Sequence, residues 1–174
     1  MARRYYRRRT VVRAPKKKWA SNMQIGSLAS GSETAKVLVE NSVQTATPTP
    51  IILKVGNIKL QGDVNIINTT SSILSNPSFV VMVFYLPEGI ALSAATANTV
   101  ASQHPEWIMA WKMIDTASVT AAAAVASPSF SVSSRLKRNL NSGDRICLGY
   151  MTDIASGSAN IRVNYTAQYW TCAN

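Results

Sequence analysis

Residues 160–170, NIRVNYTAQYW, alternate between apolar and polar side chains along their length. A period of two places successive side chains on opposite faces of a β-strand, whereas an α-helix would scatter the same residues around its surface. The segment therefore predicts a half-buried strand. Its apolar face consists of every second residue: Ile161, Val163, Tyr165, Ala167 and Tyr169.

The same pattern predicts strands through most of the chain, separated by short segments rich in Pro, Gly, Asn and Ser. The most apolar segment, Phe79–Leu86, predicts a strand that is buried on both faces. In residues 51–63 the apolar alternation slips at Gly56, which predicts a β-bulge. The other predicted strands are Ala35–Val43, Ile51–Leu60, Val64–Ile67, Trp107–Asp115, Ser129–Arg138 and Arg145–Met151.

Helical signals are sparse. Residues 91–103 are compatible with a helical turn, and the Ala-rich residues 117–127 are interpreted as a loop, with a short helix as the alternative. No apolar run approaches the ~20 residues that a membrane-spanning helix needs, so we expect no membrane insertion. Eight short strands with long connections predict an all-β fold, namely an eight-stranded antiparallel jelly-roll sandwich.

Positive charge is concentrated at the start of the chain. Residues 1–18 contain nine of the 18 Lys and Arg residues and no acid, whereas residues 19–174 contain the other nine cations and all eight acids. The sequence therefore predicts a basic arm at residues 1–19 and a nearly neutral body at residues 20–174. A block of like charges repels itself, so the arm is expected to be disordered or extended.

A basic arm of this kind is typical of nucleic-acid binding, because each phosphate that a cation neutralises releases condensed counterions. Aromatic residues lie among the cations and can stack on unpaired bases, which favours a single strand over a duplex. The alternatives are a solubilising tail, an anionic membrane surface, and docking of the aromatic residues on the body. The predicted nucleic-acid-binding residues of the arm are Arg3, Arg4, Tyr5, Tyr6, Arg7, Arg8, Arg9, Arg13, Lys16, Lys17, Lys18 and Trp19.

Two further features bear on the partners. The segments RRYYRRR and APKKKW match the pattern of nuclear-import signals, so a host nuclear-import receptor is an expected partner. In the body, Arg135, Lys137 and Arg138 form a cluster that is predicted to extend the positive surface of the arm. The alternative for this cluster is a solvated strand end before a turn.

The chain offers little for catalysis. It has one histidine, His104, and its two cysteines, Cys147 and Cys172, are 25 residues apart, which is not the spacing of a zinc site. Sequence patterns of nucleotide-binding loops, serine hydrolases and metalloproteases are absent from the chain. We therefore expect no enzymatic activity, no metal and no cofactor. Since no apolar core follows the basic start, we expect no secretion and two reduced thiols.

The body is poor in charge but rich in tryptophan and methionine, which is the composition of extensive protein interfaces. The predicted strand Trp107–Asp115 is apolar on both faces, interrupted by Lys112. We predict that one of these faces is a contact between subunits, with packing in the core as the alternative. The residues predicted for this contact are Trp107, Met109, Trp111 and Met113.

Three sequence blocks resemble, in the same order, segments of the capsid proteins of circular Rep-encoding single-stranded DNA viruses, of which circoviruses and nanoviruses are examples. They are VVMVFYLPEG at 80–89, HPEWIMAWKMID at 104–115 and SSRLKRNLNSGDRICLGY at 133–150. The resemblance covers about two thirds of the chain. This chain is shorter than circovirus coats and has a briefer arm, so no receptor site is carried over from them.

The resemblance implies a jelly roll, a T=1 icosahedral shell of sixty copies, and an arm that faces the packaged single-stranded DNA. It also implies a location in the virion, and in the host nucleus during infection. Two other functions remain open from the sequence, because an arm of this kind does not distinguish DNA from RNA. They are the coat protein of a small satellite RNA virus and a cellular nucleic-acid-binding protein of the ribosomal type.

Overall fold

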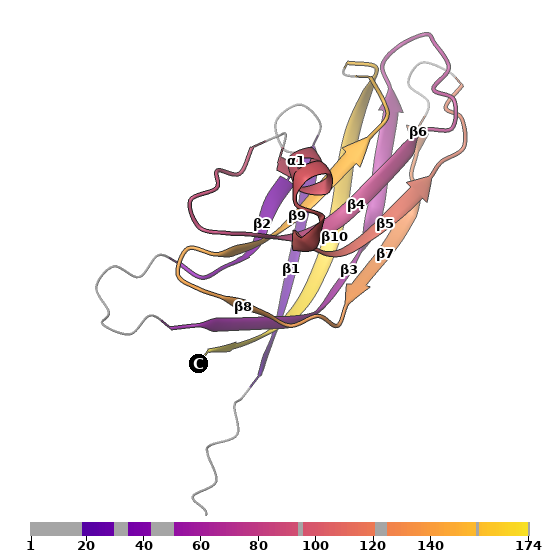
Figure 1. Ribbon diagram of the computed structural model, residues 1–174. Coiled ribbons are helices and arrows are strands. Elements are labelled where there is room, and N and C mark those ends of the chain that lie inside the picture. Colours follow the sequence, from indigo (N-terminus) through magenta and orange to yellow (C-terminus); the bar gives the residue numbers. More distant parts are fainter. Residues whose placement is uncertain are drawn as a thin grey trace, which may run out of the picture.

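The computed structural model describes residues 19–29, 35–42, 51–93, 96–120, 125–155 and 157–173. Within these residues the chain forms two antiparallel sheets, which Figure 1 shows packed against each other as an all-β sandwich. Residues 1–18 of the predicted arm lie outside the described residues.

Sheet A is built around β3 (Leu53–Asn68) and β10 (Ala159–Ala173), which pair along most of their length. One edge is β1 (Ala20–Ala29), which pairs with β10. Three short strands follow one another along the free edge of β3, in the order β8, β7 and β6. Their bounds are β6 (Val125–Ala126), β7 (Ser129–Ser134) and β8 (Arg138–Leu140).

Sheet B has four strands in the order β2, β9, β4 and β5. Their bounds are β2 (Ala35–Glu40), β9 (Arg145–Thr152), β4 (Ser78–Leu86) and β5 (Ile108–Asp115). The main core lies between the two sheets, where residues such as Leu60 of β3 and Val81 of β4 are fully buried.

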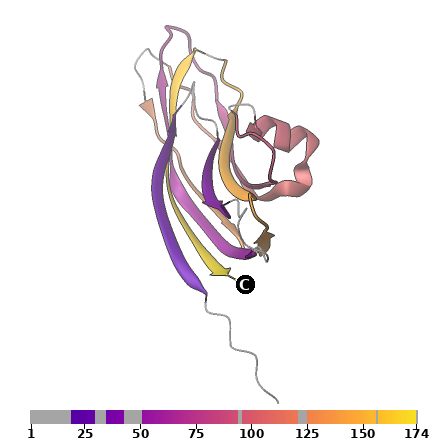
Figure 2. The same cartoon turned by 90° about the vertical axis from the view of Figure 1, so that its left-hand side faces the viewer.

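A second, smaller apolar cluster lies on the outer face of sheet B. Helix α1 (Thr96–Gln103) and the 3-10 helix η1 (Pro105–Trp107) contribute to it. Val100 of α1 is buried against Met82 and Phe84 of β4 and Cys147 of β9. Figure 2 shows the helix on one flank of the sandwich, with β1 and β10 on the opposite flank. None of the helices in the described part of the chain is long and apolar enough to span a bilayer.

Several predictions about individual elements are confirmed. The alternating segment 160–170 forms the middle of β10, and residues 91–103 contain α1. The predicted bulge is confirmed next to Gly56. Between the pairs Gly56–Trp170 and Lys59–Gln168, β3 has two residues and β10 only one. Asn57 lies in this bulge with a left-handed backbone at φ 50°.

The prediction of eight strands is wrong in number, because the described residues alone form ten. The predicted strand Ser129–Arg138 is divided into β7 and β8, and Leu136 N donates to Ser134 Oγ where β7 ends. Part of the Ala-rich segment 117–127 forms β6, and residues 121–124 lie outside the described residues. The two segments predicted at 51–60 and 64–67 are one continuous strand, β3.

Strand β1 was not predicted, because over residues 23–26 its apolar and polar residues are the reverse of the usual pattern. Met23 and Ile25 point outward and are 68% and 75% exposed, whereas Gln24 and Gly26 point inward. The core beside Gly26 is filled by its cross-strand partner Tyr165, whose hydroxyl would lie 2.6 Å from a Cβ at that position. An aromatic side chain from β10 therefore replaces the apolar residue that β1 lacks.

Candidate nucleic-acid interface

The last residue of the predicted arm contacts the predicted basic cluster of the body. Trp19 directly precedes β1 and is 38% exposed. Lys137 lies in the connection between β7 and β8, and its Nζ is 5.5 Å from the centre of the Trp19 ring, within cation–π range. The fold thus brings together two predicted nucleic-acid-binding residues that are far apart in the sequence.

The basic cluster is not one continuous surface. Arg135 and Lys137 are exposed in the β7–β8 connection. Arg138 is half-buried, and its guanidinium carbon is 4.4 Å from the centre of the Tyr85 ring. Arg138 therefore packs against β4 at the end of the sandwich, and we place it outside the surface formed by the other two.

Tyr85 of β4 lies at the same end of the sandwich as Arg138. The pKa of Tyr85 is raised to about 12, mainly by burial. A hydrogen bond to the Asp144 carboxylate and the negative charge of that carboxylate act in the same direction. The Arg138 guanidinium opposes them by favouring the charged phenolate. These three side chains form a structural contact between the sheets.

The charges of the body are distributed unevenly between the two sheets. Among the described residues, sheet A and its β7–β8 connection carry six cations and one acid, Asp63. Sheet B and the segments next to it carry three cations and six acids. The cations of sheet A are Lys54, Lys59, Arg135, Lys137, Arg138 and Arg162; those of sheet B are Lys36, Lys112 and Arg145. The acids of sheet B are Glu40, Glu88, Glu106, Asp115, Asp144 and Asp153.

Neighbouring acids do not neutralise the cations of sheet A. Within the described residues the single salt bridge joins His104 and Glu106, far from this sheet in the fold. The Asp63 carboxylate instead accepts hydrogen bonds from the side-chain amides of Asn65 and Asn164, at 3.0 and 2.9 Å. The positive charge on this side of the body is therefore available to a polyanion.

Sequence reasoning missed two lysines of this surface, Lys54 and Lys59. Five positions separate them, so a regular strand would direct them to opposite faces. The bulge at Asn57 adds one residue to β3 and returns both lysines to the outward face. The predicted slip at Gly56 was the available signal, but the sequence did not show that it placed two charges together.

The prediction for the subunit contact is partly wrong. Met109 does not share an outward face with Trp111 and Met113, because it is only 8% exposed and belongs to the core. The cause is a second bulge: β4 pairs Val83 with Ala110 and the next residue with Ile108, so Met109 is the extra residue in β5. Strict alternation across this segment therefore fails.

The remaining members of that group have different surroundings. Trp107 lies in η1, packs against the α1 cluster and meets Tyr85 edge to face, with 6.5 Å between ring centres. Trp111 and Met113 are 62% and 49% exposed on the outer face of sheet B. They pair across the strands with apolar residues of β4, namely Met82 and Val80. An exposed apolar surface thus remains beside α1.

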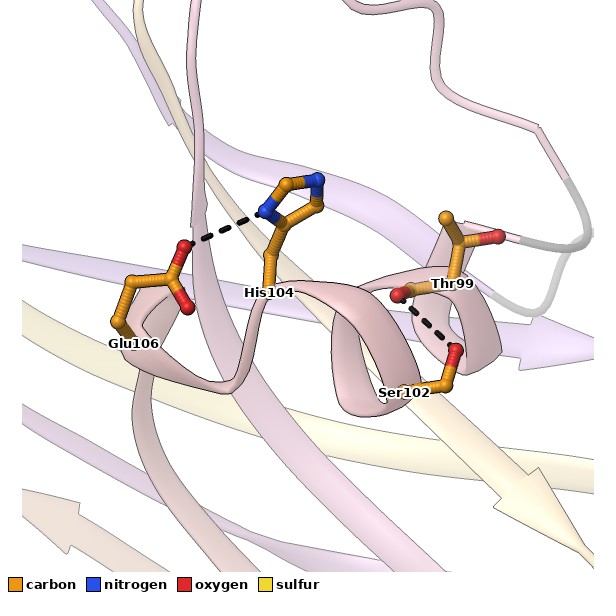
Figure 3. Close-up of polar contacts among 4 residues, drawn as sticks. All are labelled: Thr99, Ser102, His104 and Glu106. Atoms are coloured by element: carbon orange, nitrogen blue, oxygen red, sulfur yellow. Dashed lines mark hydrogen bonds and ion pairs between the residues drawn. The ribbon is translucent and has the colours of Figure 1, made fainter.

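The single histidine has a packing role. Figure 3 shows the hydrogen bond from His104 Nδ1 to Glu106 Oε1, at 3.2 Å. The imidazole also stacks on Trp107, with ring centres 3.9 Å apart and 7° between the planes. Ser102, on the preceding helix α1, donates its hydroxyl to the carbonyl oxygens of Asn98 and Thr99. This hydroxyl is thus engaged with its own helix.

Both cysteines are buried and free, and they lie on different sheets. Burial raises the pKa of the Cys147 thiol from 9.0 to about 12, and the Arg145 charge opposes this only in part. As the pH rises above 9, the unfolded chain loses this proton first, so the contribution of Cys147 to folding stability falls between about pH 9 and pH 12.

We expect Cys147 to resist alkylation by iodoacetamide in the native protein at a pH of about 8, because its reactive thiolate is not formed there. Mass spectrometry of the native chain would show Cys147 unmodified, whereas the chain in denaturant would be alkylated at both cysteines. Complete native modification of Cys147 within the time needed to modify the denatured chain would contradict its burial.

Within the described residues, His, Cys, Asp and Glu side chains form no group of three that could hold a metal ion. Comparison with known proteins adds no functional assignment, since neither a protein-family profile nor a curated protein matches this chain.

Proposed function

We propose that this chain is a viral coat protein that assembles into a shell and packages single-stranded nucleic acid through its basic arm. The observation that carries the proposal is the side on which the arm joins the body. The nine-cation arm leads directly into β1 of sheet A, and among the described residues the cations lie mainly on that sheet, while six of the seven acids lie on sheet B or next to it. One side of the subunit is therefore suited to a polyanion.

The order of the strands supports a jelly roll. β6, β7 and β8 together occupy one position beside β3, so each sheet has four strand positions. From β1 to β4, successive strands lie alternately in sheet A and sheet B. The chain changes sheet again after β5, after β8 and after β9. This repeated crossing between two four-stranded antiparallel sheets is the connectivity expected of a jelly roll, a fold that is common in viral coats.

We further propose a T=1 shell of sixty copies, with DNA as the packaged strand, a location in the virion, and entry into the host nucleus by a nuclear-import receptor. The support is the resemblance of the three sequence blocks to single-stranded DNA virus capsids. The exposed Trp111 and Met113 are the proposed contacts between copies on sheet B. Hydrophobic residues exposed side by side favour association.

Electron microscopy of the purified protein with single-stranded DNA tests this proposal. We expect closed particles of about 20 nm, the size of a small shell with icosahedral symmetry. The variant Trp111→Lys is expected to prevent their formation, because a charge would replace an apolar contact at the proposed interface. Ile73→Lys is a matched control, since Ile73 is 59% exposed but lies in the loop between β3 and β4, outside the strands of sheet B.

Two results would contradict the proposal. A chain that stays monomeric in size-exclusion chromatography at every salt concentration, with or without DNA, would exclude a shell. Particles formed equally well by Trp111→Lys and the unaltered chain would keep the shell but remove this surface from its contacts.

A further inference from the structure

Two tryptophans and four cations gather on the outward face of sheet A, at the end where β1 begins. We propose that this surface, which we call the sheet A platform, binds single-stranded nucleic acid in addition to the arm. The inference rests on the proposed function and deepens it by naming a second contact with the packaged strand. The platform consists of Trp19, Trp170, Lys54, Lys59, Arg135 and Lys137.

Lys137 connects the two tryptophans of the platform. Trp170 of β10 pairs with Gly56 of β3. A Cβ at Gly56 would lie 2.9 Å from Lys137 Cγ, so the lysine side chain crosses β3 at this glycine. Its Nζ then lies 5.5 Å from the Trp19 ring. The glycine beside Trp170 therefore leaves room for the Lys137 side chain to pass over β3 and reach Trp19.

The tryptophans are not part of the core. Trp19 is 38% exposed and Trp170 is half-buried, and neither belongs to either buried cluster. Ser21 of β1 pairs with Trp170 on the same outward face. Two large aromatic side chains at the surface, next to small and polar neighbours, offer rings on which other planar groups can stack.

The charge of the platform fits a phosphate backbone. Lys59 and Arg135 are exposed, and the neighbours of Lys59 across the strands are the uncharged Gln168 and Ser133. Among the described residues, none of the four platform cations is paired with a carboxylate. Such unneutralised cations bind phosphates by releasing counterions from the nucleic acid.

Cations next to aromatic rings at the surface favour a single strand over a duplex. The bases of a single strand can leave their neighbours and stack on indole rings, whereas the bases of a duplex are already stacked and paired. Neither stacking nor phosphate contact reads the 2′-hydroxyl, so single-stranded DNA and RNA are both expected to bind here. The position of Trp19 makes the platform continuous with the arm.

Two double variants of the full chain test the phosphate contact. Lys54→Gln/Lys59→Gln is expected to weaken binding of a thymidine homopolymer about tenfold and to reduce the log–log salt slope by about 1.4. Lys36→Gln/Lys112→Gln removes the same charge from sheet B and is expected to change affinity less than about twofold. Fluorescence anisotropy measures both. Equal effects of the two pairs would show that only net charge matters and would overturn the platform.

Tryptophan fluorescence tests the stacking. Addition of the homopolymer to the full chain is expected to quench emission, and Trp19→Phe and Trp170→Phe are each expected to reduce that quenching. Trp107→Phe is the matched control, because Trp107 packs in η1 against the outer face of sheet B and is not one of the proposed contacts between copies. Quenching that depends on Trp107 but not on Trp19 or Trp170 would contradict the proposal.

A measurement on the unaltered chain keeps the test independent of any effect of substitution on folding. Ultraviolet cross-linking to a bromodeoxyuridine oligonucleotide, followed by peptide mapping, is expected to label Trp19 or Trp170. Labels confined to residues 1–18 would overturn the platform and leave the proposed packaging by the arm intact. A full chain that binds no single strand at all would defeat both proposals.

Discussion

Deletion of residues 1–18 is expected to remove most of the salt dependence with which this protein binds single-stranded DNA. If about six of the nine arm cations contact phosphates, the arm alone gives a log–log slope of about −4. The four platform cations would leave a residual slope no steeper than about −3. Because β1 begins at Ala20, the deletion removes none of the described strands.

Titrations at several salt concentrations, with anisotropy as the signal, measure the slope. The companion variant Tyr5→Leu/Tyr6→Leu retains all nine cations, so we expect a nearly unchanged slope. We expect weaker binding, because loss of one stacked base costs about 1–3 kcal/mol. Binding that is the same with and without residues 1–18, or that persists in molar salt, would show that the arm is not the main contact with the strand.

Asp144→Ala is expected to lower the free energy of unfolding by about 3 kcal/mol, the largest effect that we expect from a single substitution outside the apolar core. The Asp144 carboxylate is 4% exposed and accepts hydrogen bonds from the backbone N–H groups of Asn141 and Glu88, at 2.8 and 3.1 Å. It also accepts a hydrogen bond from Tyr85. Alanine would leave these donors without their partner at a buried turn.

Asp153→Ala provides the matched control. Asp153 also accepts a backbone hydrogen bond, from Ser78 N at 3.0 Å, but it is exposed, so water can replace the carboxylate. We expect a loss below about 1 kcal/mol. Urea unfolding of both variants gives the comparison, provided that the slope of the transition is the same. Similar losses for the two variants would mean that the buried position of Asp144 is not what makes it important.

Alternation predicted the strands whose inward residues are apolar. β10 was found in this way, whereas β4 was found from its continuous apolar run; in both, burial follows from side-chain polarity alone. β1 was missed because its inward positions hold Gln24 and Gly26, and the space that Gly26 leaves is filled by Tyr165 from another strand. A sequence read one segment at a time cannot supply a side chain from a distant strand.

For the candidate site, residue type was predictable but direction was not. Trp111 and Met113 point outward as expected, whereas a bulge turns Met109 into the core. The bulge at Asn57 has the opposite effect on the surface, because it brings two residues together there: it places Lys54 and Lys59 on one face. Each added residue reverses the side of the sheet toward which the later side chains of that strand point. An error of one position therefore changes a surface residue into a core residue.

The division of charge between the sheets gives the body an electric dipole, although its net charge is close to zero. In the field of a polyanion such a body experiences a torque that turns sheet A toward the phosphates. At physiological salt the field decays over about 8 Å, so this rotation acts only during the final approach. A subunit that arrived reversed would present the five exposed acids of sheet B and its adjoining segments to the phosphates and would be repelled. In the proposed packaging, this would select the orientation of the subunit before any side chain touches the strand.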